Sequence, residues 1–135
     1  DNRNNELYTE RMTEYQGEKR ENAVNFIELN LMTAQTIDLI DPDGNTDTQK
    51  VEANLQQITQ RINKLQPGTT SETQNAVREY QDSVKEFVAE ARNYIIINSS
   101  YGEAYTQLFI KYNKMVSKAN VVNMAELDAT EQKKK

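Results

Sequence analysis

Residues 77–98, VREYQDSVKEFVAEARNYIIIN, form the stretch on which the fold depends. Its apolar side chains recur at alternating steps of three and four residues: Val77, Tyr80, Val84, Phe87, Val88, Ala91, Tyr94 and Ile95, with Asn98 continuing the spacing. This spacing predicts an α-helix with one apolar stripe along its length. Charged residues fill the opposite face, so other helices must cover the stripe.

The composition narrows the class of protein. At 135 residues the chain is expected to form one domain, residues 1–135, and its four glycines and two prolines argue against a turn-rich β architecture. It has no cysteine and no histidine, which excludes disulfides, thiolate or imidazole metal sites and histidine-based catalysis. The net charge of −5, without a basic stripe, argues against a nucleic-acid partner. We predict no enzyme activity, no metal and no cofactor.

Three breaks divide the chain into four helical segments. They are residues 41–48 (DPDGNTDT), 67–71 (PGTTS) and 98–102 (NSSYG), and three of the four glycines fall in them. The predicted helices cover residues 4–39, 47–66, 71–98 and 101–130. Asp47 or Thr48 is expected to cap the second helix, and Ser71 to Gln74 resembles a capping arrangement for the third.

The other three helices also carry apolar stripes. The second has Val51, Leu55, Ile58, Ile62 and Leu65, and the fourth has Tyr105, Leu108, Phe109, Tyr112, Met115, Val116, Ala119 and Val122. In the first helix Val24, Ile27, Leu31 and Ala34 are predicted to face the core. A second set, Asn25, Leu29, Met32 and Thr36, then lies on roughly the opposite side. We interpret this set either as scattered surface residues or as the interface of a twofold homodimer.

The unequal lengths of the helices predict how they are arranged. The first segment spans roughly 57 Å and the second roughly 28 Å at 1.5 Å per residue. Short turns make neighbours antiparallel, which gives an all-α, up-down-up-down four-helix bundle with long first and fourth helices. Residues 1–19 and 121–135 are then expected to protrude as a two-helix stalk with both termini at one end. No segment is apolar enough to span a bilayer, and the chain begins without Met. The start without Met indicates a piece of a longer protein, and two helices leaving one end of the bundle side by side are expected of a domain held between two membrane-spanning helices.

The first break also approaches a calcium-loop pattern. Asp41, Asp43, Asn45, Asp47, Gln49 and Glu52 fall at positions 1, 3, 5, 7, 9 and 12 of such a loop. Thr46 stands where the pattern requires glycine, and the glycine is instead Gly44. We interpret the stretch as a turn followed by a helix cap, with calcium binding as the alternative.

The chain resembles a known family over nearly its whole length. A long first helix, a shorter second one and the turn Leu65-Gln-Pro-Gly68 carry the resemblance, together with Glu79-Tyr-Gln81 and the SYGEAY run at residues 100–105. These features resemble the extracytoplasmic four-helix ligand-binding domain of bacterial methyl-accepting chemotaxis proteins. The resemblance implies a periplasmic or extracytoplasmic domain of an inner-membrane chemoreceptor. Such a domain dimerises through its first helix and signals to the membrane by a small helix displacement.

The resemblance also implies a ligand site near the membrane-distal end. In the aspartate-binding members, arginines from the last third of the first helix grip the ligand, and the start of the fourth helix adds polar groups. Here that third has no arginine or lysine, which disfavours a dicarboxylate ligand. The corresponding candidates are Asn25, Glu28, Asn30, Arg92, Tyr105, Thr106 and Gln107.

Alternatives remain at each level. Tyr105 lies on the core stripe, where packing is the usual role of a tyrosine, and Arg92 lies off its stripe, where a solvated charge is the default. The implied partner is an amino acid, an organic acid or a ligand-loaded binding protein. The competing functions are the sensor domain of a histidine kinase and a structural helical bundle without a small-molecule ligand.

Overall fold

A computed structural model describes the backbone of residues 2–41, 43, 45–97 and 102–134. It describes the side chains of residues 17, 21–41, 43, 45–96 and 104–128. Four helices make up this part of the chain, namely α1 (Asn2–Leu39), α2 (Thr48–Ile62), α3 (Ser71–Ile97) and α4 (Gly102–Lys134). No strand occurs among the described residues. The prediction of an all-α protein with four helices is confirmed.

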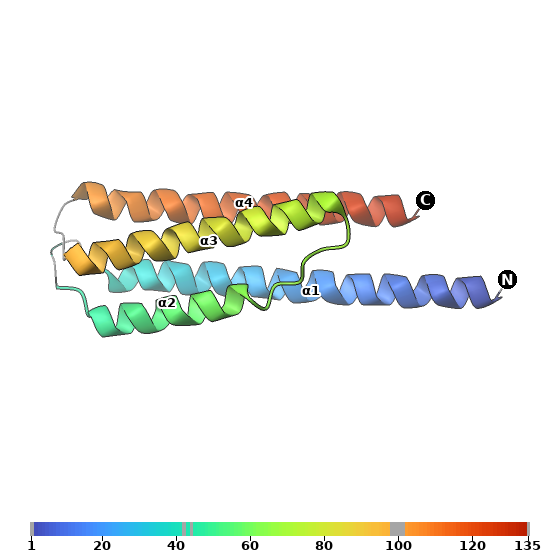
Figure 1. Cartoon of the computed structure of the whole chain (residues 1–135), viewed down its shortest axis with the longest axis horizontal. Helices are drawn as coiled ribbons and strands as arrows, with labels where there is room; N and C mark the ends of the chain where they lie inside the picture. Colours follow the sequence, from blue (N-terminus) through green and yellow to red (C-terminus); the bar gives the residue numbers. More distant parts are fainter. Residues whose placement is uncertain (1, 42, 44, 98–101, 135) are drawn as a thin grey trace.

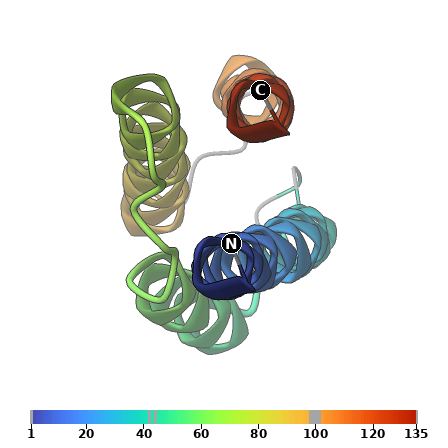
Figure 2. The same cartoon turned by 90° about the vertical axis from the view of Figure 1, so that its right-hand side faces the viewer.

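The four helices lie lengthwise around one core. Contacts join α1 with α2, α2 with α3, α3 with α4 and α4 with α1, and the end-on view in Figure 2 shows one helix at each corner. Salt bridges link Glu79 with Lys118, and Glu86 with Lys111 and Lys114. In these pairs the residue numbers fall along α4 as they rise along α3.

The first and last helices reach beyond the α2–α3 connection. Figure 1 shows α1 and α4 continuing past this connection toward the end of the molecule where both termini lie. On α4, Val122, Ala125 and Glu126 are still buried, so the prediction that a protruding stalk begins at residue 121 is wrong. Asn22 on α1 still contacts Glu126 at this level, with its Nδ2 3.5 Å from the Glu126 Oε1. The side chains of residues 129–135 and of most of residues 1–20 lie outside the described residues.

The apolar stripes of α2 and α3 form the core as predicted. All five stripe residues of the second segment are buried, and so are Val77, Tyr80, Val84, Phe87, Val88, Ala91 and Tyr94. Ile95 is half-buried, and Asn98 lies outside the described residues. On α4 the stripe is narrower than predicted: Leu108, Met115, Ala119 and Val122 are buried, whereas Phe109 is exposed at its edge.

The predicted orientation of α1 is wrong. Val24, Ile27 and Leu31 are 48%, 68% and 56% exposed, and Ala34 is only half-buried. The residues predicted to face outward point inward instead, since Leu29 and Thr36 are 0% exposed. With them on the inner face lie Asn22, Asn25, Phe26, Met32, Thr33, Ile37 and Ile40.

Hydrogen bonds explain why polar residues of α1 can occupy the core. The hydroxyls of Thr33 and Thr36 donate to the carbonyl oxygens of Leu29 and Met32 one turn earlier, both at 2.7 Å. A threonine bonded in this way buries no unpaired donor. The large apolar members of the same face then fill the space between helices.

Local capping fixes the ends of the α1–α2 and α2–α3 connections. Asp47 is the N-cap of α2, its carboxylate accepting from the Lys50 N–H at 3.3 Å, as predicted. At the start of α3 the side chains and backbones of Thr70 and Thr73 bond reciprocally, one residue earlier than the predicted arrangement. Gly68 precedes this cap with φ of +91°, and a Cβ there would lie 2.6 Å from the Thr73 Oγ1. Only glycine fits this turn without strain.

Candidate functional site

The predicted ligand-binding residues do not converge on one site. Asn25 and Glu28 on α1 both face α2, where Arg61 forms an ion pair with Glu28 and donates to Asn25 Oδ1 at 3.5 Å. Asn30 accepts a hydrogen bond from the Tyr80 hydroxyl at 3.2 Å. These α1 side chains therefore bind to neighbouring helices.

Arg92 is also engaged within the protein. Its Nη2 donates to Glu52 Oε1 at 2.9 Å and its Nε to Oε2 at 3.3 Å, in the forked geometry that arginine forms with carboxylates. This contact joins α3 to α2, so Arg92 is not directed toward the start of α4. The prediction that Arg92 could grip a ligand together with the α4 residues finds no support in this geometry.

The α4 candidates lie beside an aromatic cluster at the end of the bundle opposite the termini (Figure 1). The Tyr105 ring contacts Phe109 and Tyr94, with centroid separations of 5.1 and 6.4 Å. The Tyr94 hydroxyl donates to the Asp41 carbonyl at 3.4 Å, and burial, followed by the neighbouring Tyr105, raises its pKa. Thr106 is exposed and Gln107 half-buried next to this cluster. The ring of Tyr105 thus packs against the edge of the core.

The calcium-like stretch uses its acids for local structure. Asp41 Oδ1 accepts from the Asp43 N–H at 2.8 Å, and the Asp41 N–H donates to Thr46 Oγ1 at 2.8 Å. Among the residues that the structure describes, no three acidic side chains gather where they could hold a metal ion. Pro42 and Gly44, within the pattern, lie outside the described residues.

A buried polar junction links α1, the α2–α3 connection and α4. Asn22, 1% exposed, accepts at Oδ1 from the Gln66 N–H at 2.8 Å and donates from Nδ2 to the Gln66 carbonyl at 3.2 Å. The same Nδ2 lies 3.5 Å from Oε1 of the buried Glu126 on α4. We call Asn22, Gln66 and Glu126 the base junction. Through it α1 holds both the α2–α3 connection and α4.

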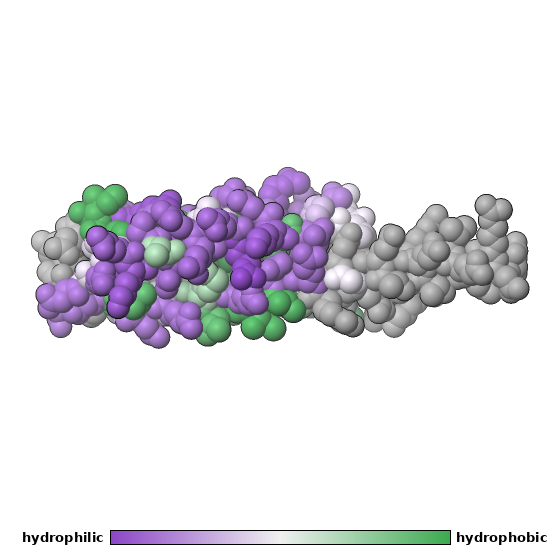
Figure 3. All heavy atoms as spheres, turned by 90° about the horizontal axis from the view of Figure 1, so that it is seen from below, coloured by the Kyte–Doolittle hydropathy of each residue, from purple (hydrophilic) through white to green (hydrophobic). Residues whose placement is uncertain are grey.

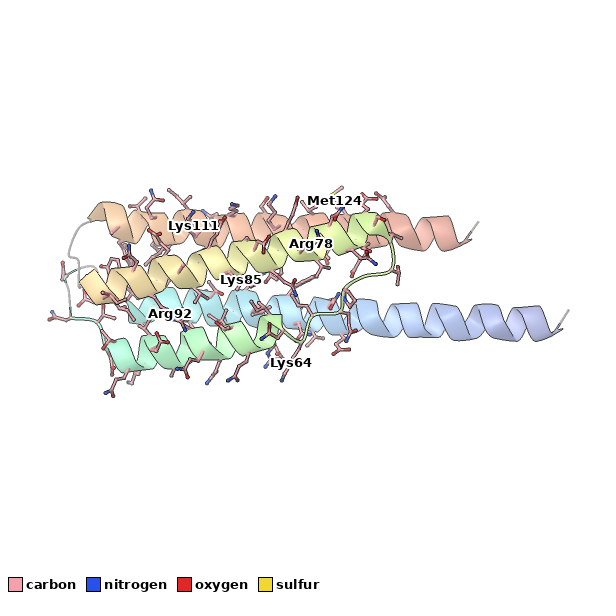
Figure 4. The ribbon with its side chains drawn as sticks, in the orientation of Figure 1. Lys64, Arg78, Lys85, Arg92, Lys111 and Met124 are labelled. Carbon is pink, nitrogen blue, oxygen red and sulfur yellow. The ribbon has the colours of Figure 1, made fainter. Side chains whose placement is uncertain are left out.

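A hollow opens on the other side of the α2–α3 connection. It has a volume of about 240 Å³ and is lined by Leu65, Pro67, Gln74, Val77, Arg78 and Gln81. Figure 4 shows Arg78 on the first turns of α3, close to where the connection joins it. Leu65 and Pro67 flank Gln66 in the sequence, so the hollow and the base junction share one short segment.

The outer face of α1 is the third candidate feature. Val24, Ile27 and Leu31 lie at steps of three and four residues, the spacing of a helix-packing seam, yet they are exposed. In Figure 3, which views the molecule from the side of α1 and α2, hydrophobic patches interrupt an otherwise hydrophilic surface. The predicted dimer interface faces the core instead: Asn25, Leu29 and Thr36 are buried, and Met32 is half-buried and packs against the core.

Comparison with protein-family models, with curated proteins and with solved structures gives no match for this chain. None of the described helices contains a stretch long and apolar enough to cross a membrane.

Sequence reasoning missed Asn22, Gln66 and Arg78. Asn22 stands seven residues before Leu29 and so shares its helical face. Once that face is known to be buried, this spacing predicts that Asn22 is buried too. The hollow had no such signal, because its lining comes from a loop and from the polar edge of α3.

Proposed function

We propose that the chain is the extracytoplasmic ligand-sensing domain of a transmembrane chemoreceptor. In this proposal it forms an antiparallel up-down-up-down bundle on the periplasmic side of the inner membrane, and α1 and α4 each continue into a membrane-spanning segment. A bound amino acid or organic acid, or a ligand-loaded binding protein, favours one packing of α4 against α1. Its differential affinity for two packings shifts their populations.

The observation that carries this proposal is the course of α1 and α4. Both extend past the α2–α3 connection and end on the same side of the molecule (Figure 1). Two helices leaving one end of a domain side by side can transmit a relative displacement of about 1–2 Å. The base junction lies where the two helices leave the shared core, and it contacts both of them through Asn22 and Glu126.

Dimerisation is the second part of the proposal. We assign it to the outer face of α1, because Val24, Ile27 and Leu31 form a helix-packing seam that no part of the described chain covers. A second copy of α1 presents the same seam, and a twofold axis would bring the two seams together.

The dimer is tested by sedimentation equilibrium over a wide range of protein concentration. Ile27→Asp should abolish association, because it places a charge in the seam. Asn93→Asp introduces the same charge at an exposed residue of α3, which lies diagonally across the bundle from α1 (Figure 2). It is the matched control and should associate like the wild type. A protein that stays monomeric throughout, or an unaffected Ile27→Asp, would contradict this assignment.

Sensing is tested by a thermal-shift screen of amino acids and organic acids, followed by a distance measurement. The chain has no cysteine, so Glu21→Cys and Asp128→Cys provide the only two thiols for spin labels, on exposed sites of α1 and α4. A compound that raises Tm by mass action should shift the label separation by about 1–2 Å. Hits that leave the separation unchanged would argue against a receptor.

A structural helical bundle is the second candidate. The exposed seam on α1 favours it, since such a protein needs a surface for partners and no ligand site. A histidine-kinase sensor domain would share the receptor geometry and differ only in its output. A dimer without any thermal-shift hit would favour the structural bundle.

A further inference from the structure

We propose that the hollow between the α2–α3 connection and α3 is a ligand site, and that it takes a small organic monoanion with an apolar body. The inference deepens the proposed sensing function, since it names the position and chemical class of the ligand. It departs from the expectation of a site at the distal end. The base junction gives such a ligand a direct route to α1 and α4.

The size and lining of the hollow match such a compound. A cavity of about 150 Å³ accommodates benzene, so about 240 Å³ leaves room for one ring or a short chain with a carboxylate. Leu65, Pro67 and Val77 supply apolar surface, while the amides of Gln74 and Gln81 supply polar groups. A few polar groups around an apolar floor are typical of small-molecule sites.

The charge of the lining selects an anion. Arg78 is the charged residue among the six that line the hollow. Within the described part of the chain it makes no ion pair, in contrast to Arg61 and Arg92, which pair with Glu28 and Glu52. An unpaired guanidinium beside an apolar floor can form a forked hydrogen-bonded pair with a carboxylate.

The walls of the hollow are held in place before any ligand binds. Gln81 Nε2 donates to the carbonyl of Ile62 at the end of α2, at 3.1 Å, and Gln74 Nε2 lies 3.5 Å from the carbonyl of Gly68. These two contacts join α3 to both ends of the connection. A preorganised wall reduces the ordering cost of binding.

The hollow is also connected to the helices that would carry a signal. Leu65 and Pro67 line it, and Gln66 between them is bonded at both its N–H and its carbonyl to Asn22. Asn22 in turn reaches Glu126 on α4. A ligand that fixes the 65–67 segment therefore restrains the group that joins α1 to α4.

The test uses benzoate as the probe and benzamide as its uncharged analogue. Titration of isotope-labelled protein should give saturable shifts of the Leu65 and Val77 methyl signals with benzoate and weaker binding of benzamide. Hydrogen exchange of the Gln66 amide should slow when benzoate binds. Arg78→Gln should weaken benzoate binding about tenfold or more, as expected for loss of a charged hydrogen-bonding partner.

Lys85→Gln is the matched control. Lys85 is an exposed cation two turns further along α3 and does not line the hollow, so its loss should change benzoate affinity less than twofold. Equal weakening by both variants, shifts confined to the distal aromatic residues, or no saturable shift at all would overturn the site.

The outcomes separate the site from the sensing function. If benzoate binds and Arg78→Gln weakens binding, while the spin-label separation between residues 21 and 128 stays fixed, the site stands and the sensing proposal fails. If benzoate does not bind while another compound shifts that separation, the site fails and sensing stands.

Discussion

The two faces of α1 differ in a way that reverses the usual expectation. Its inner face includes Asn22, Asn25, Thr33 and Thr36, all buried, whereas its outer face exposes Val24, Ile27 and Leu31. These buried polar groups are hydrogen-bonded. The threonine hydroxyls donate to carbonyl oxygens one turn earlier in α1, and the asparagine side chains bond to α2 and to the α2–α3 connection. Buried polar groups cost little when they are hydrogen-bonded.

The comparison shows that hydrophobicity alone does not orient a helix that has two apolar stripes. The inner stripe is the one that is buried. Its apolar residues share a face with polar residues, such as Asn22 and Thr33, that form hydrogen bonds inside the bundle. The outer stripe is left for a partner, which in our proposal is a second copy of α1.

The largest expected effect comes from truncating a leucine on each face. Leu29→Ala should destabilise the protein by about 2–5 kcal/mol, because Leu29 is fully buried and its removal leaves a cavity. Leu31→Ala, two residues away and 56% exposed, should change the stability of the monomer by less than about 0.5 kcal/mol. Urea unfolding at low protein concentration measures both. Equal losses, or a larger loss for Leu31→Ala, would contradict this assignment of the inner and outer faces.

A smaller effect separates the two kinds of buried polar residue. Asn22→Ala should cost about 1–3 kcal/mol, because it leaves the N–H and the carbonyl of Gln66 without their partner. Thr33→Val should be nearly neutral, since the Leu29 carbonyl keeps its bond within the helix. The same urea experiment applies. A costly Thr33→Val would show that its hydroxyl contributes more than the local bond.

The pH dependence of stability at alkaline pH tests the burial of Tyr80, which packs against the inner face of α1. Tyr80 packs edge-on against Phe26 with ring centroids 4.8 Å apart, and burial, with Tyr112 nearby, raises its pKa. The folded state thus keeps a proton that the unfolded chain loses above about pH 10, so stability should fall with rising pH by up to about 1.4 kcal/mol per unit.

Tyr80→Phe should remove this contribution between pH 9 and pH 11.5, although it also loses the bond to Asn30 at every pH. The part of the slope due to Tyr94, whose pKa is also raised, should remain. Chemical unfolding at several alkaline pH values gives the slope, and an unchanged slope in the variant would contradict the role of Tyr80.

Sequence patterns predicted α2 and α3 well because each has one apolar stripe. Val51, Leu55, Ile58 and Ile62 leave one orientation for α2, and the structure buries all four. In α1 the spacing of Val24, Ile27 and Leu31 is more regular than that of the apolar inner residues Phe26, Leu29 and Ile37, between which Thr33 stands. Choosing between them requires the partner of Asn22, which lies 44 residues away in Gln66.

The candidate site was harder to predict for the same reason. Asn25, Glu28 and Arg92 have the chemistry of ligand contacts, but partners on α2 engage them. Conversely, Arg78 looks like one more surface charge in the sequence. It becomes distinctive only when the α2–α3 connection brings Leu65 and Pro67 beside it.

The smallest effect concerns the charged surface between α3 and α4. A hydrogen bond from Lys114, and then the charges of Lys114 and Lys111, lower the pKa of Glu86. Its contribution is therefore present above the ordinary glutamate pKa and is lost as the pH falls through the lowered value. Because the pair is solvent-exposed, Glu86→Gln should cost no more than about 1 kcal/mol at neutral pH. The cost should nearly vanish in 1 M salt, where screening acts over about 3 Å.

Glu90→Gln, one turn further along α3 and without an ion pair among the described residues, should have no salt-dependent cost. A Glu86 effect that persists in high salt would show that packing, rather than charge, joins these helices at their surface.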